Sequence, residues 1–278
     1  MRKFWIIVAS ILLVAGVVLF GVFIGVNNGI DFKNLKPTNY KTNTYEFADE
    51  ITDIDVKIET ADISITPSID GKTKVVCNES EKVAHKVYVE NGSLKVTVED
   101  NRTWIDNFLS FTKHSITIYL PKTEYNSIKI ENVTGDVEVS SAFTFKNISV
   151  DVTTSDVLIC AKATDGIKIK STTGDVTVLN VNSNVIEVKL TSGDVYFKNV
   201  IANDKIAINS TTGDVELEGC DALDIYLKTT TGDVEASLLS GKIFDVNVTT
   251  GEVRVPSNSE GGNCKVETTT GDVEIVVK

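Results

Sequence analysis

Acidic residues recur at nearly constant intervals along the second half of the sequence, where together they could bind metal ions. Each follows the glycine or serine of a short motif of the TTGDV type, and successive acids lie 19 or 20 residues apart. Calcium takes about six to eight oxygen ligands, so a row of carboxylates is a candidate calcium site. The candidate ligands are Asp136, Asp156, Asp175, Asp194, Asp214, Asp233 and Asp272, and Glu252 stands at the equivalent position of one motif.

The same acids have a structural interpretation that needs no metal. Dense calcium-binding repeats are shorter and carry two glycines with the aspartate, a pattern that this sequence lacks. Carboxylates stacked about 5 Å apart would repel one another by around 1 kcal/mol even in water. Acceptance of backbone N–H groups by each carboxylate at its own corner would offset that repulsion. The pattern favours this structural role, with calcium binding as the alternative.

Other residues with catalytic potential are few. His85 and His114 lie outside the repeat, and neither has a nucleophile or metal-binding motif around it. The repeated carboxylates offer no unique pair in distinct environments, which acid–base catalysis requires. The sequence therefore predicts a protein that is not an enzyme and has no cofactor. A polysaccharide-acting enzyme of solenoid type is kept as an alternative.

The four cysteines do not form a recognisable redox or metal motif, because no CxxC pair is present. Four are also few for an exported protein held together by disulfides. In the repeat register, Cys264 stands where other copies have Ile or Phe, and Cys220 stands where they often have Ala, Val or Leu. We therefore predict that the cysteines are buried as apolar residues.

The acids belong to an internal repeat that sets the fold. Before each turn, apolar residues alternate with polar ones, as at Ile186, Val188 and Leu190 ahead of Gly193. Such alternation is typical of one face of a β-strand. After the glycine the parity shifts, so that Val195 is the next inward residue. The chain must bend at this point, because glycine permits the backbone angle that the corner needs.

Eight copies of this motif predict an all-β protein, a parallel β-solenoid of 19–20-residue turns. A unit of two short strands cannot bury its own apolar face, but units stacked about 4.8 Å apart share one continuous core. An antiparallel sandwich is the alternative. We assign the regular solenoid to residues 126–278, and to residues 46–125 an irregular β region that caps one end.

The N-terminus predicts a membrane anchor. Residues 1–3, which include Arg2 and Lys3, are expected to be cytoplasmic, and residues 4–26 contain no charge. A helix of this length would be roughly 34 Å long, enough to cross a hydrocarbon core of about 30 Å. Residues 27–45 form a tether, and the basic residues before the span predict a single-pass protein at the cell membrane with its C-terminal domain extracellular. A cleaved signal peptide is the alternative.

The net charge constrains the partners. With 27 basic and 39 acidic side chains, the formal charge is −12, which argues against binding to nucleic acid. An anionic membrane surface would also repel this charge, so the membrane is expected to be contacted through the N-terminal helix.

The sequence resembles a known bacterial family. The segments ITDIDVKIETADISI and ITIYLPKTEYNSIKIENVTGDVEV, with the repeated TTGDV turns, are similar to the putative-adhesin family whose module is domain of unknown function 4097. The resemblance covers roughly residues 46–278. It implies a surface-exposed β-strand-repeat protein with an adhesive or stress-related role, and it carries over no catalytic residue.

Two regions are candidate contacts for a partner protein or cell-wall polymer. An aromatic insert contains Trp104, Phe108, Leu109 and Phe111. We expect it to cap the open end of the core, with an apolar contact to a partner or the membrane as the alternative. The C-terminal strand ends at Ile275 and Val277, and an open edge there predicts self-association. The expected function is an adhesive or structural interaction module at the cell surface. The alternative is an accessory regulator of a cell-envelope stress response.

Overall fold

Between Tyr40 and Lys278 the alternating sequence folds into strands, as its period of two requires. The computed structural model describes residues 16, 18, 40–80, 83–100, 114–257 and 260–278. Residues 40–278 form one unit with its own core, separate from residues 1–39. All regular elements in the described part of this unit are strands, so the all-β class is confirmed.

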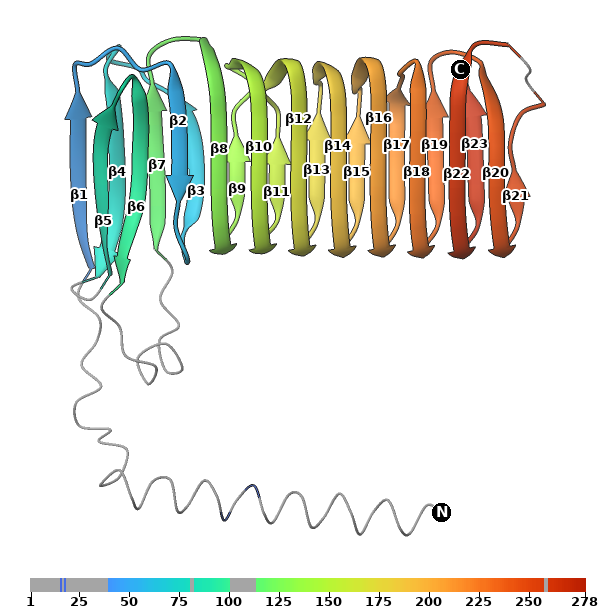
Figure 1. Ribbon diagram of the computed structural model, residues 1–278, viewed down its shortest axis with the longest axis horizontal. Coiled ribbons are helices and arrows are strands. Elements are labelled where there is room, and N and C mark those ends of the chain that lie inside the picture. The colour runs from blue at the N-terminus through green and yellow to red at the C-terminus, as the bar shows by residue number, and fades with distance from the viewer. Residues whose placement is uncertain (1–15, 17, 19–39, 81–82, 101–113, 258–259) are drawn as a thin grey trace. The chain divides into compact units, whose positions relative to one another are not determined.

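The strands of this unit pair in two rows that enclose one core (Figure 1). The first row runs in the order β5 (Val83–Glu90), β6 (Ser93–Asp100), β2 (Asp53–Lys57), β8 (Glu124–Thr134), β10 (Thr144–Thr154), β12 (Lys162–Thr173), β14 (Asn182–Ser192), β16 (Ile201–Thr212), β18 (Asp224–Thr231), β22 (Gly262–Thr270) and β20 (Lys242–Thr250). The second row runs in the order β1 (Tyr40–Phe47), β4 (Thr73–Ser80), β7 (Ser115–Leu120), β3 (Asp62–Pro67), β9 (Val137–Val139), β11 (Val157–Ile159), β13 (Val176–Leu179), β15 (Val195–Lys198), β17 (Val215–Cys220), β19 (Val234–Leu238), β23 (Val273–Val277) and β21 (Val253–Arg254).

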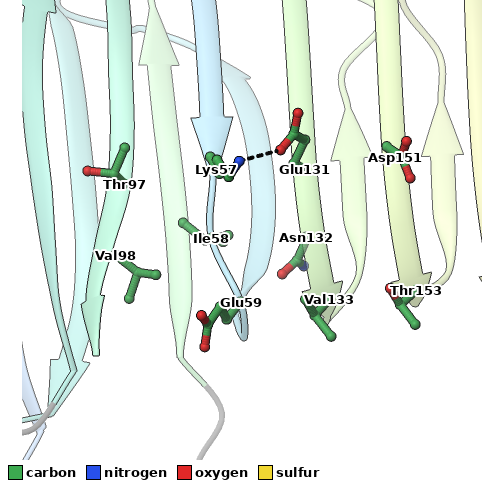
Figure 2. A pocket seen from close by; sticks show the side chains of 10 residues that line it. All are labelled: Lys57, Ile58, Glu59, Thr97, Val98, Glu131, Asn132, Val133, Asp151 and Thr153. Carbon is green, nitrogen blue, oxygen red and sulfur yellow. Dashed lines mark ion pairs between the residues drawn. The ribbon is translucent and has the colours of Figure 1, made fainter. Parts of the chain in front are cut away.

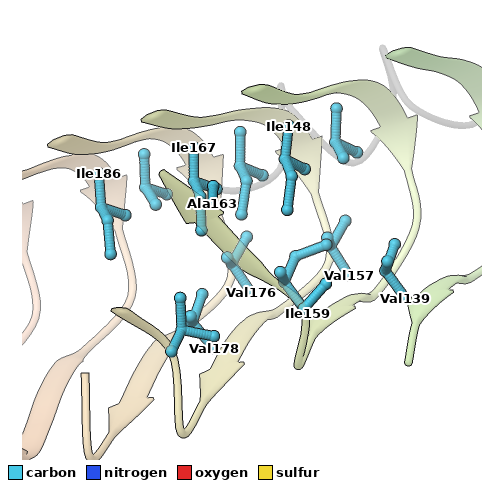
Figure 3. Close-up of a cluster of buried hydrophobic side chains, with 14 of the residues drawn as sticks. Val139, Ile148, Val157, Ile159, Ala163, Ile167, Val176, Val178 and Ile186 are labelled. Carbon is cyan, nitrogen blue, oxygen red and sulfur yellow. The ribbon is translucent and has the colours of Figure 1, made fainter. Parts of the chain in front are cut away.

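The regular coils confirm the predicted solenoid. Each coil places one strand in each row, and neighbouring coils pair in parallel, so that Ile148, Ile167 and Ile186 lie in one column. Figure 3 shows this column facing Val157 and Val176 of the other row across the interior. All five side chains are at least 98% buried. Stacking therefore gives every coil a share of the same apolar core.

The glycine of each turn has no room for a side chain. Gly193 has φ of +131°, and a Cβ on it would lie 2.3 Å from the carbonyl oxygen of Gly174 in the coil below. Ser155 takes this place in one copy and is not among the residues with positive φ. The close stacking of corners thus explains why the motif keeps glycine.

The N-terminal end of the stack departs from the regular pattern. The coil formed by β2 and β3 lies between β6–β7 on one side and β8–β9 on the other. Strands β1, β4 and β5 pair antiparallel with their neighbours, so the fold is not parallel throughout. Strand β1 begins at Tyr40, which corrects the predicted tether of residues 27–45: its last six residues belong to the β unit.

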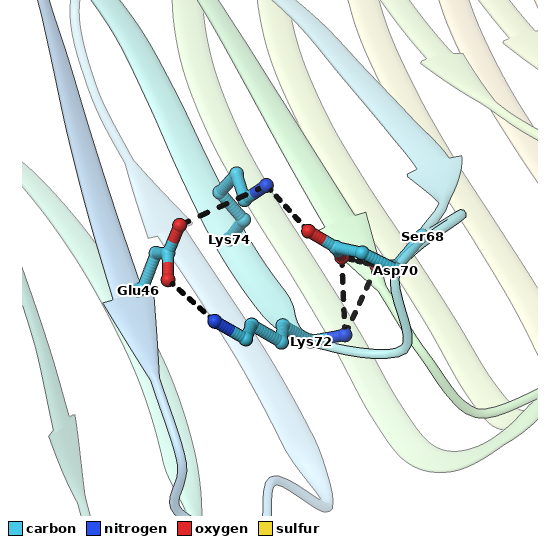
Figure 4. Close-up of polar contacts among 5 residues, drawn as sticks. All are labelled: Glu46, Ser68, Asp70, Lys72 and Lys74. Carbon is cyan, nitrogen blue, oxygen red and sulfur yellow. Dashed lines mark hydrogen bonds and ion pairs between the residues drawn. The ribbon is translucent and has the colours of Figure 1, made fainter.

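Ion pairs connect β1 to the turn that joins β3 and β4 (Figure 4). Lys72 and Lys74 both contact Glu46 of β1, with Nζ–Oε distances of 3.2 and 3.8 Å. Asp70 accepts from Ser68 and pairs with Lys74 at 2.8 Å. These bonds hold the pKa of Asp70 well below its usual value, chiefly through the hydrogen bond from Lys74.

The C-terminal end corrects the expected order of coils. The last strands in the sequence, β22 and β23, are not at the end of the stack, because they lie between β18–β19 and β20–β21. Figure 1 shows β20 and β21 at the far right, with the C-terminus one coil inward. The prediction that the last coil forms the open end is therefore wrong for β22 and for Val273 and Glu274 of β23, whereas among the described residues no strand pairs with Ile275–Val277 on that side.

Two glycines make this insertion sterically feasible. A Cβ on Gly261 would lie 2.0 Å from the carbonyl oxygen of Gly241, and one on Gly262 would lie 2.0 Å from that of Leu223. The segment that leads into β22 therefore lies so close to the neighbouring backbone that only glycine fits at these two positions. Strand β23 then pairs with β19 over five residues, whereas β21 pairs with β23 over two. The longer backbone pairing with β19 favours β23, rather than the short β21, as the neighbour of β19.

The predicted anchor, residues 4–26, falls outside the described residues except for Gly16 and Val18. Within the described residues, the structure has no helix with the length and apolar character needed to span a membrane.

Candidate functional site

The repeated acids form one continuous ladder of hydrogen bonds. At each step a carboxylate Oδ1 accepts the backbone N–H of the acid in the next coil, at N–O distances of 2.7 to 3.1 Å. In spatial order the ladder runs Asp62, Asp136, Asp156, Asp175, Asp194, Asp214, Asp233, Asp272 and Glu252. The step from Asp233 to Asp272 and back to Glu252 follows the inserted C-terminal coil.

These bonds differ from those expected at the sequence level. Each carboxylate was predicted to serve its own corner, but it bonds instead to the corner of the adjacent coil, as Asp175 does to the amide of Asp194. One oxygen of each acid is thereby engaged in stacking. A charged acceptor facing an N–H group is favourable and offsets repulsion along the ladder.

Part of the ladder lines a groove of about 610 Å³. Its acidic residues are Asp62, Asp136, Glu138, Asp156 and Asp175. Among the described residues, no three ladder acids bring their oxygens within 4.8 Å of one another, the spacing expected when one ion is shared. The structural role is thus sufficient to explain the ladder, and calcium binding remains the untested alternative.

A second depression, of about 630 Å³, lies where β2, β6, β8 and β10 end (Figure 2). Lys57 and Glu131 form an ion pair across it at 3.1 Å. The hydrogen bond from Lys129, followed by that from Lys57, lowers the pKa of Glu131. Neither depression is lined by a histidine or cysteine among the described residues. Both are open surfaces of charged and aliphatic side chains.

The predicted partner-contact residues differ in where they lie. Trp104, Phe108, Leu109 and Phe111 lie outside the described residues. Ile275 is buried in the core at 2% exposure, because β23 lies inside the stack. Val277 is half-buried. No sequence signal identifies the true end of the stack, since β20 and β22 carry nearly the same motif.

The open end of the stack is the coil of β20 and β21. Among the described strands, β20 pairs only with β22, so its other edge has no partner strand. Phe244, Val246 and Val248 face the core but are only partly buried. Their register partners Cys264 and Val266 in β22 are fully buried. The apolar core is thus incompletely covered at this end.

A buried polar cluster lies at the other end of the stack, and the sequence analysis missed it. Cys77 and Glu79 of β4 and His85 of β5 are each at most 5% exposed. Their ligand atoms all lie within 4.8 Å of one another. The available sequence signal was the alternation along β4. Glu79 lies two residues after Cys77 and four after Val75, and therefore on the same, core-facing side of the strand.

The comparisons with known proteins agree with this geometry. The family model Toastrack DUF4097 matches residues 51–204 and 160–278. The chain belongs to this family. The resemblance stated from the TTGDV turns is therefore confirmed. No curated protein matches the sequence significantly.

Several solved structures share the Toastrack fold. A putative adhesin from Parabacteroides distasonis has a TM-score of 0.58 at 17% identity, covering 86% of this chain and 98% of the other. One from Parabacteroides merdae has a TM-score of 0.57 at 14% identity, covering 86% and 96%. A putative lipid binding protein from Parabacteroides distasonis has a TM-score of 0.50 at 14% identity, with the same coverages. At such identities the likeness shows the fold alone.

Proposed function

We propose that this Toastrack protein is a non-enzymatic interaction module, anchored at the cell surface by residues 4–26, that associates end to end with a second copy. The open end formed by β20 and β21 is the observation that carries this proposal. Unpaired strand edges with exposed apolar residues template the addition of another strand. The description of fold relatives as putative adhesins supports an adhesive role.

The residues of β20 suit pairing with a second copy of the same strand. Antiparallel pairing about a two-fold axis through Val246 would place Phe244 opposite Val248 and so continue the apolar face from one copy to the next. On the outer face, Asp245 would lie opposite Asn247. No like charges meet in this register.

Exposed apolar residues around the same end would add contact area. Ile243 is 49% exposed, Val253 is 46% exposed and Val276 is 47% exposed. Beyond β21, residues Ile275–Val277 of β23 also lack a pairing strand on that side among the described residues. This part of the predicted C-terminal edge belongs to the proposed contact surface.

A charge substitution on the outer face tests the register without disturbing the core. Asn247→Asp would place a carboxylate opposite Asp245 twice in the dimer and should weaken association about fivefold. Asn247→Lys would place a cation there and should strengthen it. The matched control Asn209→Asp changes the equivalent position of an interior coil, β16, and should have no effect.

The measurement is sedimentation equilibrium of the full chain in detergent across a wide concentration range. The proposal is contradicted if the wild-type chain stays monomeric at high concentration. It is also contradicted if both charges at position 247 have the same effect as Asn209→Asp.

A further inference from the structure

The cap at the N-terminal end of the stack contains a group of potential metal ligands inside the apolar core. Alternation along β4 directs Cys77 and Glu79 inward, and β5 contributes His85 from the strand that follows. These side chains are 0%, 4% and 5% exposed. A thiol, a carboxylate and an imidazole thus converge within 4.8 Å, the only such group among the described residues.

The charge of Glu79 is poorly compensated where it lies. Its oxygens accept the backbone N–H of His85 at 2.7 Å and the side-chain amide of Asn43. Its ion-pair partner among the described residues is His85, at 3.1 Å. No lysine or arginine among the described residues pairs with this carboxylate. A buried carboxylate without a matching cation is costly.

His85 also has an atom without a hydrogen bond. Its Nε2 is buried and has no partner among the described residues, although buried imidazole nitrogens usually have one. Nδ1 lies near Glu79, which leaves the ring with bonding capacity that the protein groups described here do not use. An ion shared with Glu79 would take the lone pair of Nδ1, the ring nitrogen that faces the carboxylate oxygen Oε1 at 3.1 Å.

We propose that Cys77, Glu79 and His85 bind a zinc ion. Zinc prefers this mixture of thiolate, imidazole and carboxylate ligands, and three protein ligands leave one position of a tetrahedral site for water. On binding, the Cys77 thiol loses its proton to solvent and the sulfur forms the bond to zinc. A dication then balances one thiolate and one carboxylate, which makes the buried site neutral overall.

The proposed ion would have a structural role. Cys77 and Glu79 lie on a strand that pairs antiparallel with β1 and β7, and His85 lies on the strand of the other row that pairs with β6. The metal would therefore join the two rows at the cap, where antiparallel pairing replaces the parallel pairing of the regular coils. Bound zinc would stabilise the folded chain, because the unfolded chain holds no preformed site.

Cobalt(II) is the probe for this site, since it replaces zinc and gives a thiolate-to-metal absorption band in the near ultraviolet. The full chain in detergent, freed of metal and titrated with cobalt(II), should show this band at one ion per chain, and zinc should displace it. Cys77→Ser should abolish the band. His85→Gln and Glu79→Gln should weaken cobalt binding more than about tenfold.

Cys160→Ser is the matched control, because Cys160 is a free and partly exposed thiol outside the cluster. It should leave the band and the affinity unchanged. Cys77→Val, which keeps an apolar residue in the core, should remain folded by circular dichroism while losing the metal. The proposal is overturned if wild type shows no band, or if Cys77→Val binds cobalt as wild type does. An equal band in Cys77→Ser would likewise overturn it, since Cys77 would then not be a ligand.

Discussion

The regular coils and the two ends of the stack carry similar alternating sequences, yet they differ in how far neighbouring coils cover their apolar side chains. Between β8 and β19 each coil is covered on both sides, so that Ile167, Ile186 and Ile206 are completely or almost completely buried. At each end, one side of the outermost coil has no neighbouring strand among the described residues. At both ends the coils are not stacked in sequence order. The coil of β2 and β3 lies between β6–β7 and β8–β9 at one end, and the coil of β22 and β23 lies between β18–β19 and β20–β21 at the other.

This difference teaches that the repeat specifies the coil but not its place in the stack. The corner ladder accepts any coil that supplies an acid and its amide, as the step from Asp233 to Asp272 shows. Place is decided by features outside the motif. These include the glycines of the linker, the length of the strand after the corner, and the ion pair between buried Lys242 and Asp221, at 2.6 Å.

The largest effect should come from filling a corner of the regular coils. Gly193→Ala adds a Cβ that meets the carbonyl of Gly174 and forces an alanine into positive φ. We expect a loss of roughly 3 kcal/mol or more in the free energy of unfolding. Gly166→Ala is the control, because its Cβ would come no closer than 3.5 Å to a neighbour. Denaturant unfolding that gives equal losses for both would contradict the account of the corner.

A smaller effect should separate interior from end coils. Val188 and Val246 occupy the same repeat position, but the first is fully buried in β14 and the second is partly exposed in β20. Val188→Ala should cost about 2 kcal/mol, and Val246→Ala should cost less than half of that. Thermal unfolding of the two variants checks this ranking. Similar losses would mean that the end is covered as well as the interior.

Substitutions in the acid ladder should have a modest effect that depends on the acceptor rather than the charge. Asp194→Ala removes the acceptor of the Asp214 amide and should cost about 1 kcal/mol. Asp194→Asn keeps an acceptor oxygen and should be nearly neutral. Millimolar calcium added to metal-free protein should leave the Tm unchanged. A large increase in Tm with calcium that both variants abolish would show that the ladder binds calcium.

The smallest effect should come from the ion pairs at the N-terminal end. Because the folded state depresses the pKa of Asp70, its contribution is complete above the ordinary carboxyl range and declines as the pH falls through and below it. Asp70→Asn should lower the Tm only slightly at neutral pH, since the group is exposed. The difference from wild type should shrink in acid. A loss of Tm that is the same at neutral and acidic pH would contradict this account of Asp70.

Much of the fold could be predicted because the repeat is local information. Alternation and the Gly-Asp corner predict two strands per coil and a shared core, and the structure has both. The burial of Cys220 and Cys264 followed from the same register. The order of the last coils could not be predicted, because Phe244 and Cys264 occupy the same repeat position and each is an apolar residue that can stack on Ile225 of β18.

The candidate sites were less predictable than the fold. The ladder residues were identified correctly, but the direction of their bonds depends on how closely successive corners stack. The cluster of Cys77, Glu79 and His85 escaped notice because it depends on pairing at the cap, where the sequence has no period. Tertiary contacts of this kind join residues that no short motif links.

Cross-linking at the C-terminal end tests the order of coils most directly. In the first row Lys265 of β22 lies between Tyr226 of β18 and Asp245 of β20. Adjacent strands, about 4.8 Å apart, are within reach of a disulfide, and strands two places apart are not. With Cys160 replaced by serine, the double variant Tyr226→Cys/Lys265→Cys should form a disulfide on mild oxidation, as should Lys189→Cys/Asn209→Cys in the interior. The variant Tyr226→Cys/Asp245→Cys should not. Efficient cross-linking of positions 226 and 245, with none between 226 and 265, would show that the coils stack in sequence order and would contradict the insertion.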